Sequence, residues 1–393
     1  MDMNEIELGS VITDIAAGPF GSNLKVSCFV DDGFPIVDGA NLKGYKVTDN
    51  ITKYVTEEKA RSLHRSIARR GDIIVTISGT VGQIAYIPDD SQYEEYLCSQ
   101  RQFRATFDSR KVYVPYLVFY FHTYEGSHKI LSFVNQTGVP ALSQPLKNFK
   151  KIRLILPPLD EQKRIASIIE LLNNRIENNN LINQNLQEQA KALYSDMIVD
   201  KADGTWFPGT LSDVAIVTMG QSPKGDTYNE DGTGTVFFQG RAEFGFRFPT
   251  RRLYTTEPKR MAQSNDALMS VRAPVGDMNV AYEDCCIGRG LSAIRSKDGH
   301  QSYVLYTMFD LSEQLDVFNG EGTVFGSINR DALNNLPISI PPKKVMDQFE
   351  ALVSPMDAAI RNNYEEICRL ESLRDSLLPR LMSGELDVSE IEI

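Results

Sequence analysis

Two long stretches of the chain carry apolar residues at intervals of three and four, the spacing of one face of an α-helix. The first stretch, residues 157–200, has no Pro or Gly after Pro158. Its apolar positions are Ile165, Ile168, Ile169, Leu172, Ile176, Ile182, Leu186, Ala190, Leu193 and Met197. A seven-residue register joins Ile165, Leu172, Leu186 and Leu193, with Asn179 as its polar member, which predicts a coiled-coil stripe. About 40 residues at 1.5 Å each predict a rod of roughly 60 Å.

The second stretch, residues 343–393, repeats this pattern. Its apolar positions are Phe349, Val353, Met356, Ile360, Ile367, Leu370, Leu373, Leu377 and Leu381. Pro355 predicts a kink or a fresh helix start with Ser354 as its cap, and Pro379 and Gly384 mark the end. Both stripes need apolar cover, and the simplest arrangement packs the two helices antiparallel within one chain.

Each helix follows a stretch in which strands dominate, residues 1–156 and residues 201–342. In the first, residues 72–77, a tight turn at 78–82 and residues 84–87 predict a strand, a turn and a second strand. Residues 57–70 look helical with one basic side. Residues 114–121 are apolar and aromatic, and their pattern is equally that of a buried helix or a buried strand. Residues 200–208 are expected to be a linker.

The two halves echo one another. Residues 8–11 return as 208–211, residues 72–77 as 266–271, Val81 and Gly82 as Val275 and Gly276, and Arg101 as Arg289. The Pro-Pro junctions match as well, since residues 154–158 return as 338–342, with Glu161-Gln162 after the first junction and Asp347-Gln348 after the second. A duplicated chain of this kind predicts an internal pseudo-two-fold repeat.

Composition narrows the class of protein. Of 393 residues, 42% are hydrophobic and 24% charged, and no apolar run approaches the ~20 residues of a membrane helix. Five cysteines without a CxxC suggest neither a disulfide framework nor a zinc knuckle, so we expect a cytoplasmic protein. The net charge of −11 argues weakly against nucleic-acid binding, but residues 1–156 hold 18 Lys and Arg against 17 Asp and Glu, whereas residues 343–393 hold 6 against 11. This distribution of charges is compatible with DNA binding by the two strand-rich stretches alone.

The order of these segments resembles the specificity subunit of type I restriction–modification systems. The likeness spans essentially the whole chain and is strongest at residues 156–176 and 377–386, the latter with Ser383-Gly384-Glu385-Leu386. Lys343-Lys344-Val345-Met346 before Asp347-Gln348 departs from the family pattern and leaves the start of the second helix open. The resemblance implies an α+β fold in which two globular target recognition domains are joined by two long antiparallel coiled-coil helices. The domains would be residues 1–156, the spacer helix 157–200, residues 201–342, and the distal helix with its tail 343–393.

By the same resemblance, each head reads one half of a split sequence in double-stranded DNA. Two methylation subunits would dock on the helices and methylate adenine from S-adenosylmethionine, and restriction subunits using ATP and Mg²⁺ would complete the nuclease. No cofactor is expected in this chain, and no membrane partner. The helix positions taken to form the docking platform are Ile165, Leu172, Ile176, Leu186, Leu193, Ile360, Ile367, Leu370 and Leu377.

Clustered Arg and Lys residues in the heads are the candidates for DNA contact, through phosphates or base edges. They are Arg61, Arg65, Arg69, Arg70, Arg101, Lys147 and Lys150 in the first head, and Arg241, Arg247, Arg251, Arg252, Lys259, Arg260 and Arg289 in the second. For any single residue a solvated surface charge is an equally good explanation. The turns at 79–82 and 273–276 fit either loops that approach DNA or ordinary hairpin turns.

Signatures of catalysis or metal binding are missing from the sequence. It has no GxxxxGK[ST] motif, its four histidines are scattered, and neither Pro-Pro pair sits between Asn or Asp and an aromatic residue, as an adenine methyltransferase requires. Two alternatives to a recognition subunit stay open. One is a DNA enzyme with a catalytic site hidden in one head, and the other is a coiled-coil scaffold that never touches nucleic acid.

Overall fold

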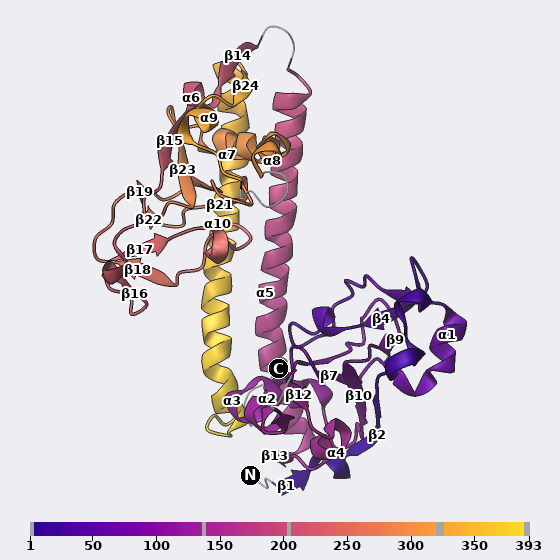
Figure 1. Cartoon of the computed structure of the whole chain (residues 1–393). Helices are drawn as coiled ribbons and strands as arrows, with labels where there is room; N and C mark the ends of the chain where they lie inside the picture. The colour runs from indigo at the N-terminus through magenta and orange to yellow at the C-terminus, as the bar shows by residue number, and fades with distance from the viewer. Residues whose placement is uncertain (1–3, 136–138, 203–205, 320–325, 389–393) are drawn as a thin grey trace. The chain divides into compact units, whose positions relative to one another are not determined.

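The computed structural model describes residues 4–135, 139–202, 206–319 and 326–388. The chain divides into two compact units, residues 1–177 with 367–393, and residues 178–366. Each unit holds one strand-rich head together with part of both long helices, α5 (Leu159–Tyr194) and α10 (Lys343–Met382). In each unit the stretch of α5 lies beside the stretch of α10 (Figure 1). No helix in the described part of the chain is long and apolar enough to cross a membrane.

The first head is built on two sheets. The antiparallel sheet has the order β2-β10-β7-β8, with bounds Ile12–Ala17, Gln102–Phe107, Ile73–Thr76 and Ile84–Tyr86. The mixed sheet has the order β3-β5-β4-β9-β6, with bounds Phe29–Val30, Tyr54–Val55, Phe34–Val37, Glu95–Cys98 and Ile67–Arg69. Two strand pairs complete it, β1 (Asn4–Glu7) with β13 (Arg153–Leu156) and β11 (Val134–Asn135) with β12 (Ala141–Leu142). Its helices are α1 (Glu57–Ser62), α2 (Val114–His122), α3 (Tyr124–Leu131) and α4 (Pro145–Lys150).

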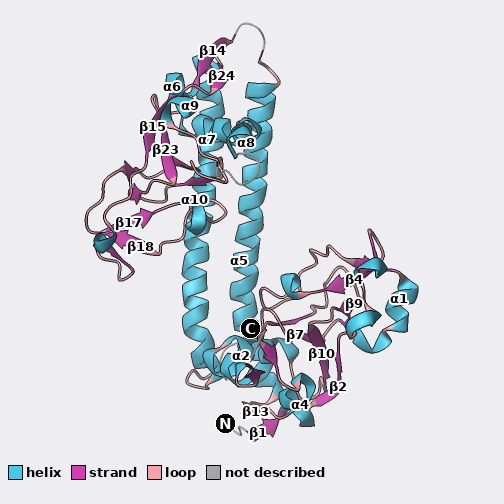
Figure 2. Cartoon of the chain, in the orientation of Figure 1, coloured by secondary structure: helices cyan, strands magenta, loops and turns pink. Residues whose placement is uncertain are grey.

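The second head repeats this plan. Its antiparallel sheet is β15-β23-β20-β21, with bounds Ala215–Met219, Leu291–Ser296, Ala267–Ser270 and Met278–Val280. Its mixed sheet is β16-β18-β17-β22-β19, with bounds Tyr228–Asn229, Leu253–Thr255, Thr235–Phe238, Cys285–Ile287 and Met261–Ala262. β14 (Phe207–Thr210) pairs with β24 (Pro337–Ile340). The helices are α6 (Leu211–Val214), α7 (Gln301–Asp310), α8 (Ser312–Asp316) and α9 (Arg330–Asn334); Figure 2 shows these short helices set against the strands.

Within each unit the two long helices run antiparallel. In the first unit, Ile165 and Ile169 share a buried cluster with Leu378 and Leu381. In the second unit, the Asn363 side chain donates to the Asn183 side chain at 2.9 Å, while Tyr194 packs edge-on against Phe349. Increasing residue numbers on α5 therefore meet decreasing numbers on α10, as the sequence predicts.

The buried face of α5 differs in detail from the predicted stripe. Ile165, Ile169, Ile176 and Ala190 are buried, but Ile182 is 46% exposed and its neighbour Asn183 is 2% exposed. The amide of Asn183 tolerates burial because it accepts a hydrogen bond from Asn363. Polar pairing thus replaces apolar contact at this level of the helix pair.

Three local predictions are settled by tertiary contacts. Residues 114–121 form helix α2, which begins with Pro at its first turn and is buried on nearly all sides. The prediction of one helix over residues 57–70 is wrong, because α1 stops at Ser62 and residues 67–69 form β6, paired with β9. Of the two alternatives predicted at Pro355, a kink or a fresh helix start, the fresh start is wrong. α10 continues through it, with Ser354 and Pro355 on the exposed face, where solvent can hydrate the carbonyl left without its N–H partner.

The structure describes only part of the linker predicted at residues 200–208. Residues 203–205 lie outside the described part, and Phe207 and Pro208 already belong to β14. On the other side of the second head, β24 leads directly into the Pro341-Pro342 junction and α10, just as β13 leads into Pro157-Pro158 and α5. The repeat of residues 154–158 at 338–342 is therefore confirmed.

Candidate nucleic-acid interface

Three turns of the first head meet where their strands end. The Ser99 N–H donates to the Val37 carbonyl (3.0 Å), and the Ile77 N–H donates to the Arg101 carbonyl (2.6 Å). These bonds place residues 38–40, 78–82 and 99–101 side by side, and we call them the first turn surface. A cavity of about 830 Å³ opens here, lined by polar side chains that include Lys43, Lys53, Thr80, Gln83, Gln100 and Arg101.

The second head builds the same arrangement. The Gly288 N–H donates to the Phe238 carbonyl (2.8 Å), the Gly290 N–H to Gln239 (3.2 Å), and the Val271 N–H to the Gly290 carbonyl (2.9 Å). Residues 239–241, 272–276 and 288–290 therefore form a second turn surface. An ion pair between Arg241 and Asp277 ties the first of these turns to the residue that follows the second.

Hydrogen-bond registers align the strands that carry the two turn surfaces. Phe103 lies opposite Val75 and Ser292 lies opposite Met269, so these pairs occupy equivalent places in the two heads. The matching of residues 72–77 with 266–271 is confirmed, as is that of Gly82 with Gly276, since both glycine N–H groups donate to the equivalent residues Thr76 and Ser270. Both glycines have positive φ, 84° and 97°, the region that a turn of this shape reserves for glycine.

Two sequence matches need correction. Arg101 is equivalent to Gly290, because their carbonyls accept from the equivalent N–H groups of Ile77 and Val271. Arg289 is therefore the counterpart of Gln100, one place away from the match that the sequence suggested. Residues 8–11 do not match 208–211 either, since Leu8 and Leu211 are the equivalent pair, with N–H groups donating to Ile152 and Leu336.

Against this geometry, the chain matches the family model for the type I restriction modification DNA specificity domain twice, over residues 24–188 and 204–367. The chain belongs to this family. Each specificity-domain match covers one head and most of the long helix that follows it, so the internal repeat is a repeat of the family's own unit.

Similar proteins extend over nearly the whole chain. A Methanocaldococcus jannaschii protein with the provisional name type I restriction enzyme MjaX specificity subunit is 26% identical, covering 91% of this chain and 88% of its own length. The type I restriction enzyme MjaIX specificity subunit of the same organism is 22% identical, covering 97% of this chain and 93% of its own. The crystal structure of a type I restriction–modification S subunit from M. genitalium is 13% identical. It aligns over 97% of this chain and 96% of that one, with a TM-score of 0.62, a likeness of fold.

The predicted DNA-contacting residues of this specificity-domain protein fall into separate groups. Arg101 and Arg289 lie on the turn surfaces. Arg241 also lies on the second turn surface, in an ion pair with Asp277. Arg260 lies beside that surface, where its carbonyl accepts a hydrogen bond from the Ile287 N–H (2.9 Å). Arg69 and Arg70 precede β7, at the end of that strand away from the turn surface. Lys147 and Lys150 belong to α4, which packs beside Gly9 at the start of β2, whereas the other end of β2 reaches Gly18 against Ser99.

Most of the remaining candidates are engaged in ion pairs within their head. Arg61 pairs with Glu57 and Glu95, and Arg69 with Glu95. Further pairs join Arg70 to Glu94, Arg251 to Glu283, Arg252 to Glu230 and Glu243, and Lys259 to Glu257. Arg65 is exposed, and its backbone carbonyl accepts from the Arg104 side chain (3.1 Å).

Arg247 is the one DNA-binding candidate that burial contradicts. Its side chain is 4% exposed, forms an ion pair with Asp357 of α10, and lies over the Tyr306 ring at 5.7 Å. Because DNA cannot reach it, its role is to hold the second head to α10. Sequence alone could not separate Arg247 from its neighbours, since all of them stand in one basic and aromatic segment.

The side chains predicted to form the docking platform are largely buried within the chain. Ile165, Ile176, Ile360 and Ile367 are 0–7% exposed. Leu172, Leu186, Leu193, Leu370 and Leu377 are partly buried. The four isoleucines therefore cannot present themselves to another subunit, which corrects their assignment. Exposed apolar side chains that the stripe prediction left aside are Leu171, Leu181 and Leu352.

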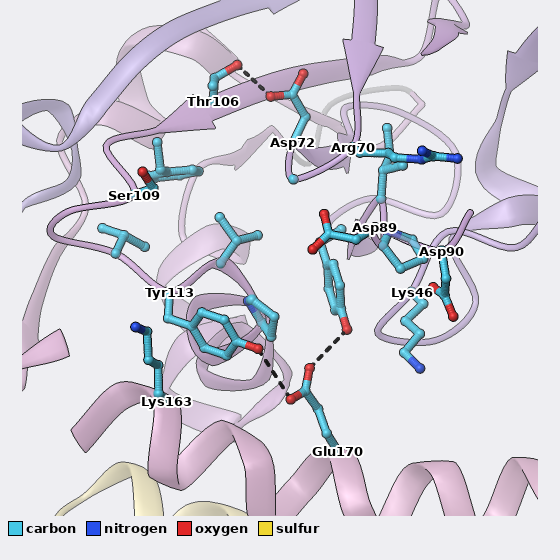
Figure 3. A pocket seen from close by; sticks show the side chains of 18 of the residues that line it. Lys46, Arg70, Asp72, Asp89, Asp90, Thr106, Ser109, Tyr113, Lys163 and Glu170 are labelled. Carbon is cyan, nitrogen blue, oxygen red and sulfur yellow. Dashed lines mark hydrogen bonds between the residues drawn. The ribbon is translucent and has the colours of Figure 1, made fainter. Parts of the chain in front are cut away.

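A second cavity of about 650 Å³ lies between the first head and α5, within one unit. Glu170 of α5 accepts hydrogen bonds from Tyr86 (3.3 Å) and Tyr113 (3.5 Å), and Figure 3 shows its carboxylate facing Tyr113 and the cavity. Burial raises the pKa of Glu170 above its usual value, although Tyr86, Lys46 and Tyr113 act in the opposite direction. This carboxylate was not recognised in the sequence, where it stands as one acidic residue among many on a polar helix.

Proposed function

We propose that this chain is the DNA-recognition subunit of a type I restriction–modification complex and has no catalytic activity of its own. Each head would read one half of a bipartite DNA sequence through its turn surface. The observation that carries this proposal is that the same three turns meet in both heads, at the ends of strands that match in hydrogen-bond register. Two similar surfaces with different side chains suit a site with two different halves.

The heads also suit DNA for electrostatic reasons. Arg101, Arg260 and Arg289 are exposed, and none has an ion pair among the described residues, so they are available to phosphates or bases. Several other arginines of the heads, among them Arg61, Arg69, Arg251 and Arg252, are paired with neighbouring carboxylates. Although the net charge of the chain is −11, each turn surface would thus present at least one unpaired arginine to DNA.

The long helices would carry the partner subunits. We propose that two methylation subunits dock on faces of α5 and α10 that the heads leave exposed, and methylate adenine with S-adenosylmethionine. Restriction subunits using ATP and Mg²⁺ would add DNA cleavage. The exposed leucines of these helices, Leu171, Leu181 and Leu352, support a docking role for the helix surface.

The test is a comparison of adenine methylation across the genome of a host that expresses the methylation subunit from the same locus, with and without this chain. We expect a split motif that appears only when the chain is present. An active methylation subunit whose methylated sequence does not depend on the chain would contradict the proposal and favour a scaffold. Methylation or cleavage of DNA by the purified chain alone would instead favour an enzyme.

A further inference from the structure

The two turn surfaces differ systematically in where they carry arginine. The registers of the strands place Arg260, Arg272 and Arg289 of the second head where the first has Ser66, Ser78 and Gln100. The matching 3-10 turns Gly39–Asn41 and Arg241–Glu243 place Arg241 where the first head has Gly39. The reverse holds at a single place in this set, where the first head has Arg101 and the second has Gly290. The two heads therefore offer different hydrogen-bond donors at the same points of one scaffold.

Not all of these side chains are available. Arg241 is held by Asp277, and the amide of Gln100 donates to the carbonyls of Gly21 (3.1 Å) and Leu24 (2.6 Å). Arg101, Arg272 and Arg289 are exposed, with no ion pair in the described part of the chain. The guanidinium of Arg101 lies over the neighbouring turn, 3.5 Å from where a side chain on Gly79 would begin.

The backbone around Arg289 is fixed. A Cβ atom on Gly288 would lie 2.8 Å from the Gln239 Cα, and one on Gly290 would lie 2.8 Å from the Gln239 carbonyl oxygen. The Arg289 N–H also donates to the Ser222 hydroxyl at 3.2 Å. Two glycines in backbone contact thus hold Arg289 at a defined point, as a residue that reads a base requires.

Arginine has a specific chemistry at DNA. Its planar fork donates two hydrogen bonds in a fixed geometry that matches the O6 and N7 acceptors of guanine in the major groove, whereas a contact to phosphate carries no base preference. Resting on the proposed function, we propose that Arg289 and Arg272 each specify a G·C pair in the half-site of the second head, and that Arg101 specifies one in the half-site of the first. The half-site of the second head then contains the larger number of arginine-read G·C pairs.

The test uses the full chain with its methylation subunit and reads the methylated motif for Arg289→Ala, Arg289→Lys and Arg101→Ala. With Arg289→Ala we expect one G·C position of one half to relax, the preference for the correct base falling about 10- to 100-fold. Arg289→Lys should relax the same position to a smaller extent, because lysine can still donate to guanine but lacks the rigid fork. Arg101→Ala should relax a position in the other half, and Arg251→Ala, at an ion-paired exposed arginine outside the turn surface, should change neither.

Three results separate the hypotheses. An unchanged motif with Arg289→Ala, at normal methylation yield, overturns the assignment of Arg289. Uniformly weaker methylation that Arg289→Lys restores also overturns it, since that behaviour identifies a phosphate contact. A wild-type chain that produces no split motif refutes the proposed function itself. Thermal unfolding of each variant identifies loss of folding, and because Arg101 and Arg289 lie in different heads, either one tests the inference without the other.

Discussion

The side-chain oxygen of Gln162 accepts a hydrogen bond from the backbone N–H of Tyr113 at 2.8 Å, so that α5 caps the start of α2. Its amide group donates to the carbonyls of Lys111 and Pro157, both at 2.9 Å, and the side chain is fully buried. The second head solves the same problem differently. Glu350 of α10 accepts from the N–H groups of Ser302 (3.1 Å) and Tyr303 (3.2 Å) at the start of α7. In both heads, the long helix supplies partners to a helix end that would otherwise be buried without them.

We predict that Gln162→Met lowers the free energy of unfolding by about 2–3 kcal/mol, because it leaves buried backbone groups without partners. The helix starts at Leu159 and Lys343 make Met346 the counterpart of Gln162, so the sequence match of Gln162 with Gln348 is wrong by two positions. Since α10 carries methionine at this place, the size of the side chain is not the expected cause. Urea unfolding of Gln162→Met and of a control variant measures the change in the free energy of unfolding. The control is Gln348→Met, on the exposed side of α10, which should change stability by less than about 0.5 kcal/mol. Equal effects of the two changes would show that the buried amide has no special role.

A buried ion pair holds the second head to α10. We predict that Arg247→Met costs about 3–5 kcal/mol, since it leaves the Asp357 carboxylate without its cation. The double change Arg247→Met with Asp357→Leu should recover most of that loss. Arg251→Ala, which breaks a half-exposed pair with Glu283, should cost less than about 1 kcal/mol. A double variant no more stable than Arg247→Met would contradict this account.

We predict that His300 makes the stability of the second head depend on pH. Its two ring nitrogens lie 2.8 Å from carboxylate oxygens of Asp298 and of Asp347 on α10, and Lys343 also pairs with Asp347. Burial lowers the His300 pKa, but the two carboxylates outweigh it and raise the pKa above its usual 6.5. Because the folded pKa is the higher one, this stabilisation is complete below about pH 6.5 and is lost as the pH rises through the folded value.

The expected result is that His300→Gln flattens the dependence of the melting temperature on pH between about pH 6 and the folded pKa. The matched change at the exposed His64 should leave that dependence as it is in the wild-type chain. A wild-type melting temperature that rises steadily over this range, unaffected by His300→Gln, would mean that other groups dominate.

For Glu170 we predict that removal of the charge stabilises the folded chain. Its raised pKa means that the folded chain holds this proton more tightly than the unfolded chain. Stability therefore falls as the pH rises from the ordinary glutamate value through the folded one. Glu170→Gln, which can keep the contacts with Tyr86 and Tyr113, should raise the melting temperature more at pH 8 than at pH 5. Glu188→Gln on the exposed side of the same helix serves as the control, and an equal shift at both pH values would refute the prediction.

The sequence predicted the order of elements because strong local signals produce it. Pro-Pro junctions and apolar spacing locate α5 and α10, and the apolar runs on either side of the turn at 78–82 locate β7 and β8. Helix propensity failed at residues 67–69, where pairing with β9 overrides it. It also failed at Pro355, since the cost of proline depends on whether solvent reaches the freed carbonyl.

The candidate interface was harder to predict. Arg247 and Arg251 are alike in sequence, and only the packing against Asp357 separates a buried anchor from a surface residue. The match of Arg101 with Arg289 failed by one position, because equivalence within a sheet is set by hydrogen-bond register rather than by residue identity. No sequence signal reveals that three distant turns meet.

The measurement that tests the central claim most directly is the methylated motif of a chain whose second head, residues 207–340, is replaced by the corresponding head of another member of the family. These boundaries keep the paired strands β14 and β24 together. The account predicts that one half of the motif changes to a new sequence while the other half stays as in the wild-type chain. An unchanged motif, from an exchanged chain shown to fold and to support methylation, would contradict the claim that each head reads its own half-site.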